Sequence, residues 1–483
     1  MRLLSLVSAA AYAVASVTAS SVTAASACTQ IAAAVSSASD VYYLGSLHYA
    51  KDVYHWASSS SQNSACSFEP GTPEDVGIAL QIIANTSTPF AVKGGGHASN
   101  PGFSSSTGVT IAMYRFSQVT YDASSETAVI GTGLIWDDVY TALEPYNVNV
   151  VGGRVTGVGV AGFTLGGGYS WLTNQYGLTI DTVVSYELVM PNGTVTTVTE
   201  ASNPELFFGL RGGLNNFGIV TSFTLKTVPQ GQVWGGLITF TENVLDQVNQ
   251  ATADFQGNNT DPKATLITTY NFLLGEPGVS QILFYDGPSP PTGLFDEFLA
   301  IPYLTKDIST RSFLSLVQAS PANVTASTRA FFNTVSVTGY PLELVQDVLN
   351  ETIYYGSTLQ WISGVFISYD VEAFLPSLFS HGSNSAYPPD RSQGLLPLNI
   401  YYAWELPTAD ADMHTAIIQS QATLKAKAEA LGQNISNAAL YNNYAVYDTT
   451  IEEIYGDNVP RLQALKAQID PNNVMGLAGG FKF

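Results

Sequence analysis

Apolar residues recur at helical spacing in the segment that begins near residue 70. Turn-forming residues at 69–73 precede apolar residues at positions 76, 78, 79, 80, 82 and 83, a spacing typical of one helix face. The next apolar run, Phe90–Lys93, follows Thr88-Pro89 and leads directly into Gly94-Gly95-Gly96-His97. A short run bounded by proline and glycine favours a strand. The pattern therefore predicts a helix, a strand and a glycine loop in that order.

Short β-like runs separated by Gly and Asn dominate residues 108–229. They lie at 109–111, 127–130 and 148–151, and a helix is expected over 136–143. The runs 183–190 and 194–198 flank Pro191-Asn192-Gly193, which predicts a hairpin. Two more glycine-rich stretches cover 152–168 and 211–218.

Glycine density falls near residue 230. From there to about 440, aromatic strands at 282–285, 362–369 and 398–404 alternate with helix-like stretches. A chain of 483 residues has room for more than one core. We expect two domains, the first over 67–232 and the second over 233–444, with residues 445–483 returning to the first.

Composition narrows the class of protein. Charged residues make up 11% of the chain, and the net charge is −21, which argues against nucleic-acid backbones and anionic membrane surfaces as partners. Arg2, an apolar run and small residues up to Ala27 are typical of a secretory signal peptide. We assign it to residues 1–24 and expect a secreted protein without a membrane span.

The two cysteines, Cys28 and Cys66, follow this segment. An even pair in an oxidising compartment favours a disulfide. The expectation of secretion also makes the N-x-Ser/Thr sequons candidate glycosylation sites. They lie at Asn85, Asn192, Asn258, Asn323, Asn350 and Asn434.

Three glycine clusters in one domain favour a cofactor with phosphates, because glycine lets backbone N–H groups approach an anion. One stretch, Gly157-x-Gly159-x-x-Gly162, matches the dinucleotide fingerprint, and Asp181 follows 19 residues later. A helix starting there would contain Gly166-Gly167-Gly168, and each interior glycine costs roughly 1 kcal/mol. We therefore reject the nicotinamide dehydrogenase interpretation.

Other chemistries leave no motif in the sequence. It contains no H-E-x-x-H, no G-x-S-x-G and no Walker A lysine, and its five histidines are dispersed, so we expect no metal site. His97 stands apart, because its imidazole follows three glycines and can press against a ligand lying over them.

Val92-Lys93-Gly94-Gly95-Gly96-His97 resembles the flavin-attachment motif of the vanillyl-alcohol-oxidase (PCMH-type) FAD-linked oxidoreductases, in their berberine-bridge-enzyme-like branch. The resemblance implies that the histidine bonds to the 8α-methyl of FAD. Many relatives attach FAD a second time through a cysteine, but here that position falls near Val155. We therefore expect covalent FAD through His97 alone, and the two cysteines match the N-terminal disulfide of the branch.

The resemblance extends over most of the chain. Residues 157–168 with 176–181 look like the second flavin-binding segment, and residues 206–220 like the third. Tyr441-Asn442-Asn443-Tyr444 is similar to the Y-x-N-Y active-site strand of the family. The cofactor-binding residues implied are Lys93, Gly94, Gly95, Gly96, His97, Gly157, Gly159, Gly162, Gly218, Val220 and Asn443.

The resemblance also implies where proton transfer occurs. Tyr441 and Tyr444 lie near the flavin, and Tyr401 occupies the place of an acidic or amide residue of relatives; these three are the catalytic candidates. Alternation along the strand puts Asn399, Tyr401 and Glu405 on one face. Tyrosine has a reference pKa near 10, so a base at neutral pH needs that value lowered.

The implied fold class is α+β: a PCMH-type FAD-binding domain and a substrate domain of antiparallel sheet covered by helices. The implied function is oxidation of a small organic substrate, with hydride transfer to FAD and reoxidation by O₂. Within it, a secondary metabolite competes with an oligosaccharide as substrate. A flavin-binding protein without turnover is the alternative from another class.

Overall fold

The computed structural model describes residues 23–483, so the signal peptide predicted for 1–24 lies almost wholly outside the described residues. Residues 23–34 are helical. A disulfide joins Cys28 of this helix to Cys66, at the start of β2 (Cys66–Glu69). Within residues 23–483, no helix is long and apolar enough to cross a bilayer.

The first sheet has the order β1-β2-β4-β3. β2, β4 and β3 run parallel, and β1 pairs antiparallel with β2 at the edge. The connecting helix α3 (Pro73–Thr86) begins where the Thr72 hydroxyl accepts a bond from the Asp75 amide. Its apolar face is buried against the sheet, as the spacing predicts. The strands are β1 (Asp40–Tyr42), β4 (Val109–Ala112) and β3 (Phe90–Lys93).

The second sheet is antiparallel, with the order β5-β6-β10-β8-β9. The predicted hairpin is confirmed as β8 (Val183–Val189) and β9 (Val195–Val198), and the predicted helix as α4 (Trp136–Leu143). The other strands are β5 (Val119–Asp122), β6 (Thr127–Gly131) and β10 (Ile219–Lys226).

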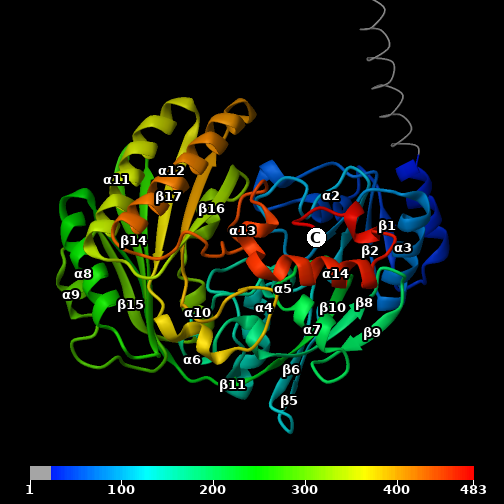
Figure 1. The fold of residues 1–483 in the computed structure, drawn as a ribbon, viewed down its shortest axis with the longest axis horizontal. Coiled ribbons are helices and arrows are strands. Elements are labelled where there is room, and N and C mark those ends of the chain that lie inside the picture. The colour runs from blue at the N-terminus through cyan, green and yellow to red at the C-terminus, as the bar shows by residue number, and fades with distance from the viewer. Residues whose placement is uncertain (1–22) are drawn as a thin grey trace, which may run out of the picture.

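The third sheet is antiparallel and has seven strands in the order β15-β12-β14-β13-β17-β18-β16. Helices α8 (Leu245–Asn258), α11 (Leu342–Leu359) and α12 (Asp410–Ala430) cover one face of it, on the left of Figure 1. The strands are β12 (Val233–Thr241), β13 (Ala264–Leu273), β14 (Glu276–Tyr285), β15 (Thr305–Arg311), β16 (Arg329–Val337), β17 (Gly364–Glu372) and β18 (Leu396–Trp404).

The C-terminal segment returns to the first part of the chain, where α14 (Val459–Ile469) packs near α7 (Pro204–Leu210). Ala478 forms a parallel bridge with Phe90 of β3. The buried Lys466 ammonium donates to the Asn216 carbonyl. Hydrogen bonding as well as packing therefore holds the C-terminal segment against the first domain.

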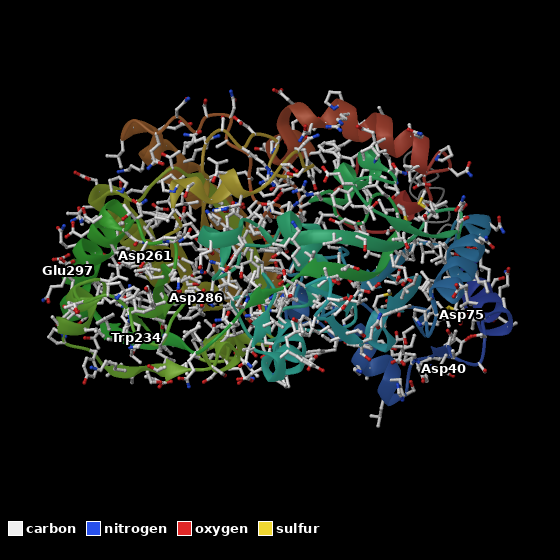
Figure 2. All side chains as sticks on the ribbon, turned by 90° about the horizontal axis from the view of Figure 1, so that it is seen from below. Asp40, Asp75, Trp234, Asp261, Asp286 and Glu297 are labelled. Atoms are coloured by element: carbon white, nitrogen blue, oxygen red, sulfur yellow. A yellow bond between two sulfur atoms is a disulfide. The ribbon has the colours of Figure 1, made fainter. Side chains whose placement is uncertain are left out.

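The remaining elements are short and connect these layers. They are α2 (Leu47–Val53), α5 (Val160–Leu165), α6 (Thr173–Tyr176), α9 (Asp296–Ala300), α10 (Phe313–Val317), α13 (Ile451–Tyr455), β7 (Val148–Asn149) and β11 (Val228–Pro229). Acidic side chains lie at both ends of the molecule, with Asp40 and Asp75 at one end and Asp261 and Glu297 at the other (Figure 2). The α+β two-domain fold is confirmed.

Candidate active site

His97 follows β3 at the end of the triple-glycine loop. Its imidazole stacks on the Trp56 indole, with ring centroids 4.5 Å apart and planes 13° from parallel. Burial lowers the pKa of His97 to about 4, so the ring is neutral at physiological pH. Its Nε2 is buried and has no hydrogen-bond partner among the described residues.

The first two glycine clusters meet directly. A Cβ added to Gly95 would lie 2.5 Å from the Cα of Gly159, so only glycine fits at this crossing. Gly94 is also tightly packed, since its Cβ would lie 3.0 Å from the Thr132 carbonyl oxygen. Gly157 and Gly162 differ, because an added Cβ would meet no heavy atom within 4 Å. Of the three glycines in the fingerprint match, one is therefore packed and two face open space.

A short helix, α5, begins directly after Gly159, where the fingerprint match falls, and ends before Gly166. This explains how a helix can start there without containing the three glycines. The loop before it is held by Asp137, whose carboxylate accepts bonds from the Thr156 hydroxyl at 2.6 Å and the Gly157 amide at 2.9 Å.

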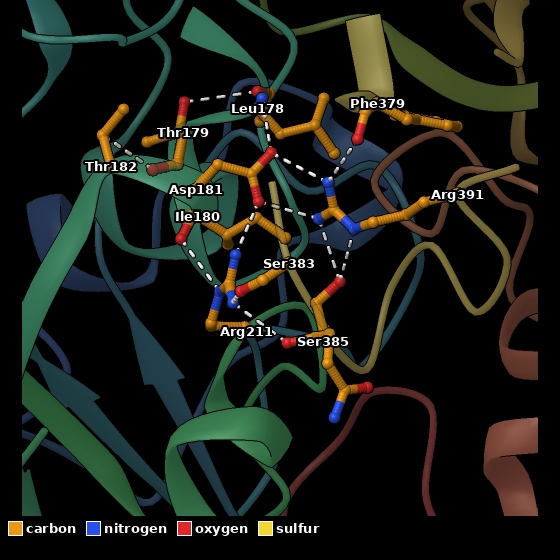
Figure 3. A network of polar contacts seen from close by, with 12 residues as sticks. Leu178, Thr179, Ile180, Asp181, Thr182, Arg211, Phe379, Ser383, Ser385 and Arg391 are labelled. Atoms are coloured by element: carbon orange, nitrogen blue, oxygen red, sulfur yellow. Dashed lines mark hydrogen bonds and ion pairs between the residues drawn. The ribbon is translucent and has the colours of Figure 1, made fainter. Parts of the chain in front are cut away.

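Asp181, the acidic residue that follows the fingerprint match, has its side chain buried between two arginines. It forms ion pairs with Arg211 at 2.6 Å and Arg391 at 2.8 Å. Figure 3 shows these side chains converging from the 178–182 turn, the end of α7 and the 382–395 segment. We call residues 382–395 the strap. Its Tyr387 packs 5.6 Å from the Tyr441 ring, so the Asp181 cluster holds one wall of the tyrosine site.

The other predicted cofactor residues have defined neighbours. The Lys93 ammonium is buried and donates to the Lys51 carbonyl and the Tyr114 hydroxyl, and its side chain lies beside Gly96, where an added Cβ would lie 2.6 Å from the Lys93 Cε. Burial lowers its pKa to about 8. Gly96 adopts a φ of +76°, which favours glycine. Gly218 packs against the Val189 carbonyl, and Val220 is buried within β10.

The Tyr441–Tyr444 motif forms a turn, rather than the strand implied by the resemblance. The Tyr444 amide donates to the Tyr441 carbonyl at 3.0 Å, and the turn brings the two rings to 5.0 Å, edge to face. The Tyr441 hydroxyl accepts bonds from the Gly168 amide and the Asn443 side chain. Burial raises the pKa of Tyr441 to about 12, and these two bonds oppose that rise.

Tyr444 lies inside a buried ion pair. Its hydroxyl donates to Glu372 Oε1 at 2.9 Å and accepts from Arg154 at 3.0 Å. Arg154 and Glu372 are themselves 2.6 Å apart, and their side chains are 6% and 1% exposed. Burial raises the pKa of Glu372, and Arg154 opposes that rise. Sequence reasoning missed both residues, although Arg154 stands among glycines in a chain that has only 17 Lys and Arg residues.

Tyr401 lies at the edge of this cluster. Its hydroxyl donates to Thr325 at 2.9 Å, and burial raises its pKa. It faces the Trp56 and Phe332 rings at 5.5 Å and 4.7 Å. Glu405 follows the end of β18 and is not part of the strand face that alternation predicts.

Aromatic contacts connect the two halves of the site. Trp56, which stacks on His97, lies 6.0 Å from the Phe332 ring, and Phe332 lies 6.0 Å from Tyr444. The histidine of the first domain and the tyrosines therefore belong to one cluster, although they are far apart in the sequence.

The described residues fit a flavin dinucleotide. His97 offers a buried ring nitrogen that has no hydrogen-bond partner in the described part of the chain, and Gly157 and Gly162 leave space that a Cβ would fill. Backbone donors can hold a pyrophosphate in a chain with so few basic side chains. His97 and the two open glycines are the residues that would hold the cofactor.

Comparison with known proteins gives two family matches. Residues 64–199 match the FAD binding domain, and residues 440–478 match the berberine and berberine-like family. The FAD binding domain match contains His97 and the second glycine cluster. The berberine-like match contains the tyrosine turn.

The chain is 40% identical over 260 residues to an uncharacterized FAD-linked oxidoreductase of Arthroderma benhamiae, a match that spans about half of each chain (53% and 51%). It is 32% identical over 465 residues to the FAD-dependent monooxygenase drtC of Aspergillus calidoustus, covering 92% of this chain and 87% of that one.

Among solved structures, 6-hydroxy-D-nicotine oxidase from Arthrobacter nicotinovorans superposes with a TM-score of 0.75 at 19% identity, covering 90% of this chain and 96% of that one. The Physcomitrella patens BBE-like 1 protein superposes with a TM-score of 0.73 at 20% identity, covering 92% and 97%. These two show a shared fold. Together with the family matches and the 32% identical relative, they identify the chain as a member of the berberine-bridge-enzyme-like branch of the PCMH-type FAD-dependent oxidoreductases.

Proposed function

We propose that this protein is a secreted oxidase that transfers a hydride from a small organic substrate to FAD held covalently through His97 alone, with dioxygen as the final electron acceptor. Bound FAD supplies a flavin ring that accepts a hydride from a C–H bond beside a hydroxyl, an amine or an activated carbon. The protein must bind and orient the substrate and accept the proton that leaves with the hydride.

The arrangement around Tyr444 carries the proposal. The Tyr444 hydroxyl already donates to Glu372, so a proton can pass from the phenol to this carboxylate. The Arg154 guanidinium donates to the Tyr444 oxygen and stabilises negative charge on it, which opposes the burial and the Glu372 charge that raise the pKa of Tyr444 well above its usual value. Because burial raises the pKa of Glu372, its carboxylate holds a proton better than an exposed one. The substrate's hydroxyl proton then moves to Tyr444 Oη.

Tyr441 has a different role. Its hydroxyl accepts two hydrogen bonds, from Gly168 and Asn443, and keeps its own proton for a third partner. We assign it as the donor that orients a substrate oxygen. Asn443 positions Tyr441 and does not itself move protons.

The walls of the site favour an aromatic substrate over a carbohydrate. The rings of Phe332, Tyr401 and Tyr444 lie close together, and flat substrates stack on such rings. The Tyr401 hydroxyl is satisfied by Thr325, and the Asn399 amide donates to Asp370. A sugar needs many free polar partners, and much of the polar surface here is paired internally. We therefore propose an aromatic or polyketide-like metabolite as the substrate.

Acid precipitation tests the cofactor link. We expect the yellow colour to stay in the pellet of the wild-type protein. The His97→Ala variant should either contain no FAD or release all of its FAD into the supernatant. Complete release of FAD from the wild-type protein would contradict covalent attachment.

A substrate panel tests the reaction. Phenolic and polyketide-like alcohols should bleach the flavin, and air should restore its colour with formation of hydrogen peroxide. Bleaching by oligosaccharides alone would instead assign a carbohydrate oxidase, and bleaching by neither set would favour a binding protein. Tyr444→Phe should lower the rate of bleaching by about 10²–10⁴-fold. Tyr401→Phe is the matched control and should change that rate little, because its hydroxyl is engaged by Thr325.

A further inference from the structure

We infer that Trp56 is a positioning residue for the flavin-attachment histidine, an inference that rests on the covalent attachment proposed above. Trp56 lies outside the matched FAD binding domain, in the segment between α2 and the 3₁₀ helix Ser58–Ser60. Its indole stacks on the His97 imidazole, with centroids 4.5 Å apart and an interplanar angle of 13°. One face of the attachment ring is therefore covered by another ring.

Backbone bonds fix the indole relative to the loop it covers. The Trp56 amide donates to the Gly96 carbonyl at 3.0 Å, the residue directly before His97. The Trp56 carbonyl accepts from the Ser327 amide at 2.8 Å. Trp56 is thus attached both to the glycine loop and to the substrate domain, and neither can shift without moving the indole.

The indole also packs against two further aromatic rings. Phe332 lies 6.0 Å away and nearly parallel, and Tyr401 lies 5.5 Å away and tilted by 41°. These contacts limit the movement of the indole and, through the stack, that of the imidazole. Nε1 of Trp56 and Nε2 of His97 are both buried and have no hydrogen-bond partner within residues 23–483, so neither polar atom draws its ring out of the stack.

A fixed, neutral imidazole suits the attachment reaction. The bond forms between a ring nitrogen of His97 and the 8α carbon of FAD, while one C–H bond and the N–H bond break. Two electrons pass to the flavin, and dioxygen removes them with both protons as hydrogen peroxide. The nitrogen must hold its lone pair on the line to that carbon, and such alignment removes much of the entropic cost of a bond-forming step. Burial keeps the ring unprotonated, with a pKa of about 4 for His97.

The experiment separates attachment from binding. Trp56→Leu and Trp56→Phe are produced in a riboflavin-supplied host, and the FAD retained and released by acid is measured, together with the mass of the peptide containing His97. We expect Trp56→Leu to keep at least half of the total FAD while its covalent fraction falls about tenfold or more. Trp56→Phe keeps a flat ring and should restore the covalent fraction to within about twofold of the wild type.

A matched control comes from a second stack of an aromatic ring on a histidine, outside the cluster around His97. Tyr42 and His48 stack at 4.4 Å and 11°, and Tyr42→Leu should leave the covalent fraction unchanged. Equal covalent fractions in Trp56→Leu and wild type would overturn the inference, as would parallel losses of total and covalent FAD. Wild-type protein with only releasable FAD would instead overturn the attachment itself. If the leucine variant does not fold, Trp56→Met takes its place under the same criteria.

Discussion

Gly95 and Gly159 touch backbone to backbone: a Cβ on Gly95 would lie 2.5 Å from the Cα of Gly159, and one on Gly159 would lie 2.6 Å from the amide nitrogen of Gly95. The glycine loop that ends in His97 therefore rests directly on the second glycine cluster. This crossing fixes the position of the histidine relative to the open glycines, Gly157 and Gly162.

Alanine at the crossing should destabilise the protein. Gly95→Ala forces two backbones apart, and overpacking of this kind costs typically 1–3 kcal/mol. We expect the free energy of unfolding, measured in urea, to fall by about that amount, and the FAD content to fall with it.

Gly162→Ala is the matched control for the crossing. It lies in α5 and faces open space, so alanine should leave the free energy of unfolding of flavin-free protein unchanged or raise it by up to about 1 kcal/mol. Its FAD content should still fall, since the methyl group enters the space assigned to the cofactor. Retention of full FAD in Gly162→Ala would contradict that assignment.

Substitutions at Arg154 and Glu372 should have strongly coupled effects on the free energy of unfolding. Arg154→Met leaves a buried carboxylate unpaired, which costs about 3–5 kcal/mol of the free energy of unfolding. The double variant Arg154→Met/Glu372→Met should be more stable than Arg154→Met alone, because an apolar pair needs no compensating charge. Chemical denaturation of the wild type, Arg154→Met, Glu372→Met and the double variant measures this coupling, and strictly additive effects would show that the two residues act independently.

The Asp181 cluster should hold the strap. Asp181→Asn removes the charge that two arginines share, and we expect a loss of about 3–5 kcal/mol in the free energy of unfolding and faster proteolysis within 382–395. Asp390→Asn is the control, because this exposed carboxylate of the strap accepts its hydrogen bonds from the neighbouring Ser392, and the free energy of unfolding should change by less than about 0.5 kcal/mol. Equal proteolysis of the two variants would contradict the role of Asp181.

The disulfide should contribute strongly to stability. Cys28 and Cys66 are 38 residues apart, and closing a loop of this size is worth about 4 kcal/mol in the chain-entropy model. Cys28→Ser/Cys66→Ser should therefore lower the free energy of unfolding by a few kcal/mol, as urea titration measures. Thiol titration of unfolded, unreduced wild type checks the pairing, and two free thiols would contradict it.

His55 should make stability fall at acidic pH. Burial and the nearby Lys93 lower its pKa from 6.5 to about 4. Between these values the unfolded state binds more protons than the folded one, so the free energy of unfolding falls as pH drops from about 6.5 to 4, by up to about 3 kcal/mol.

Urea midpoints of the wild type and of His55→Gln, taken from pH 8 to pH 4, measure this effect. The two curves should run parallel above pH 7, and the wild-type curve should fall more steeply below it. If the two curves ran parallel from pH 8 to pH 4, His55 would not be the group whose protonation lowers stability.

Local features could be predicted because each depends on neighbouring residues. The strand and loop before His97, the helix Trp136–Leu143 and the hairpin around Pro191-Asn192-Gly193 follow from spacing and turn chemistry. The motif around His97, together with the segments that resemble the second and third flavin-binding segments, was sufficient to predict the family and the fold class.

The site itself depends on contacts between distant segments. Arg154 meets Glu372 and Tyr444 across the two domains, and Trp56 reaches His97 from the N-terminal segment. The amino-acid order by itself determined the local elements, the glycine loops and the family, because periodicity and turn chemistry act over a few residues. Only the tertiary structure decided which arginine, glutamate and indole surround the tyrosines and the histidine, because a pair brought together by packing needs no regular separation along the chain.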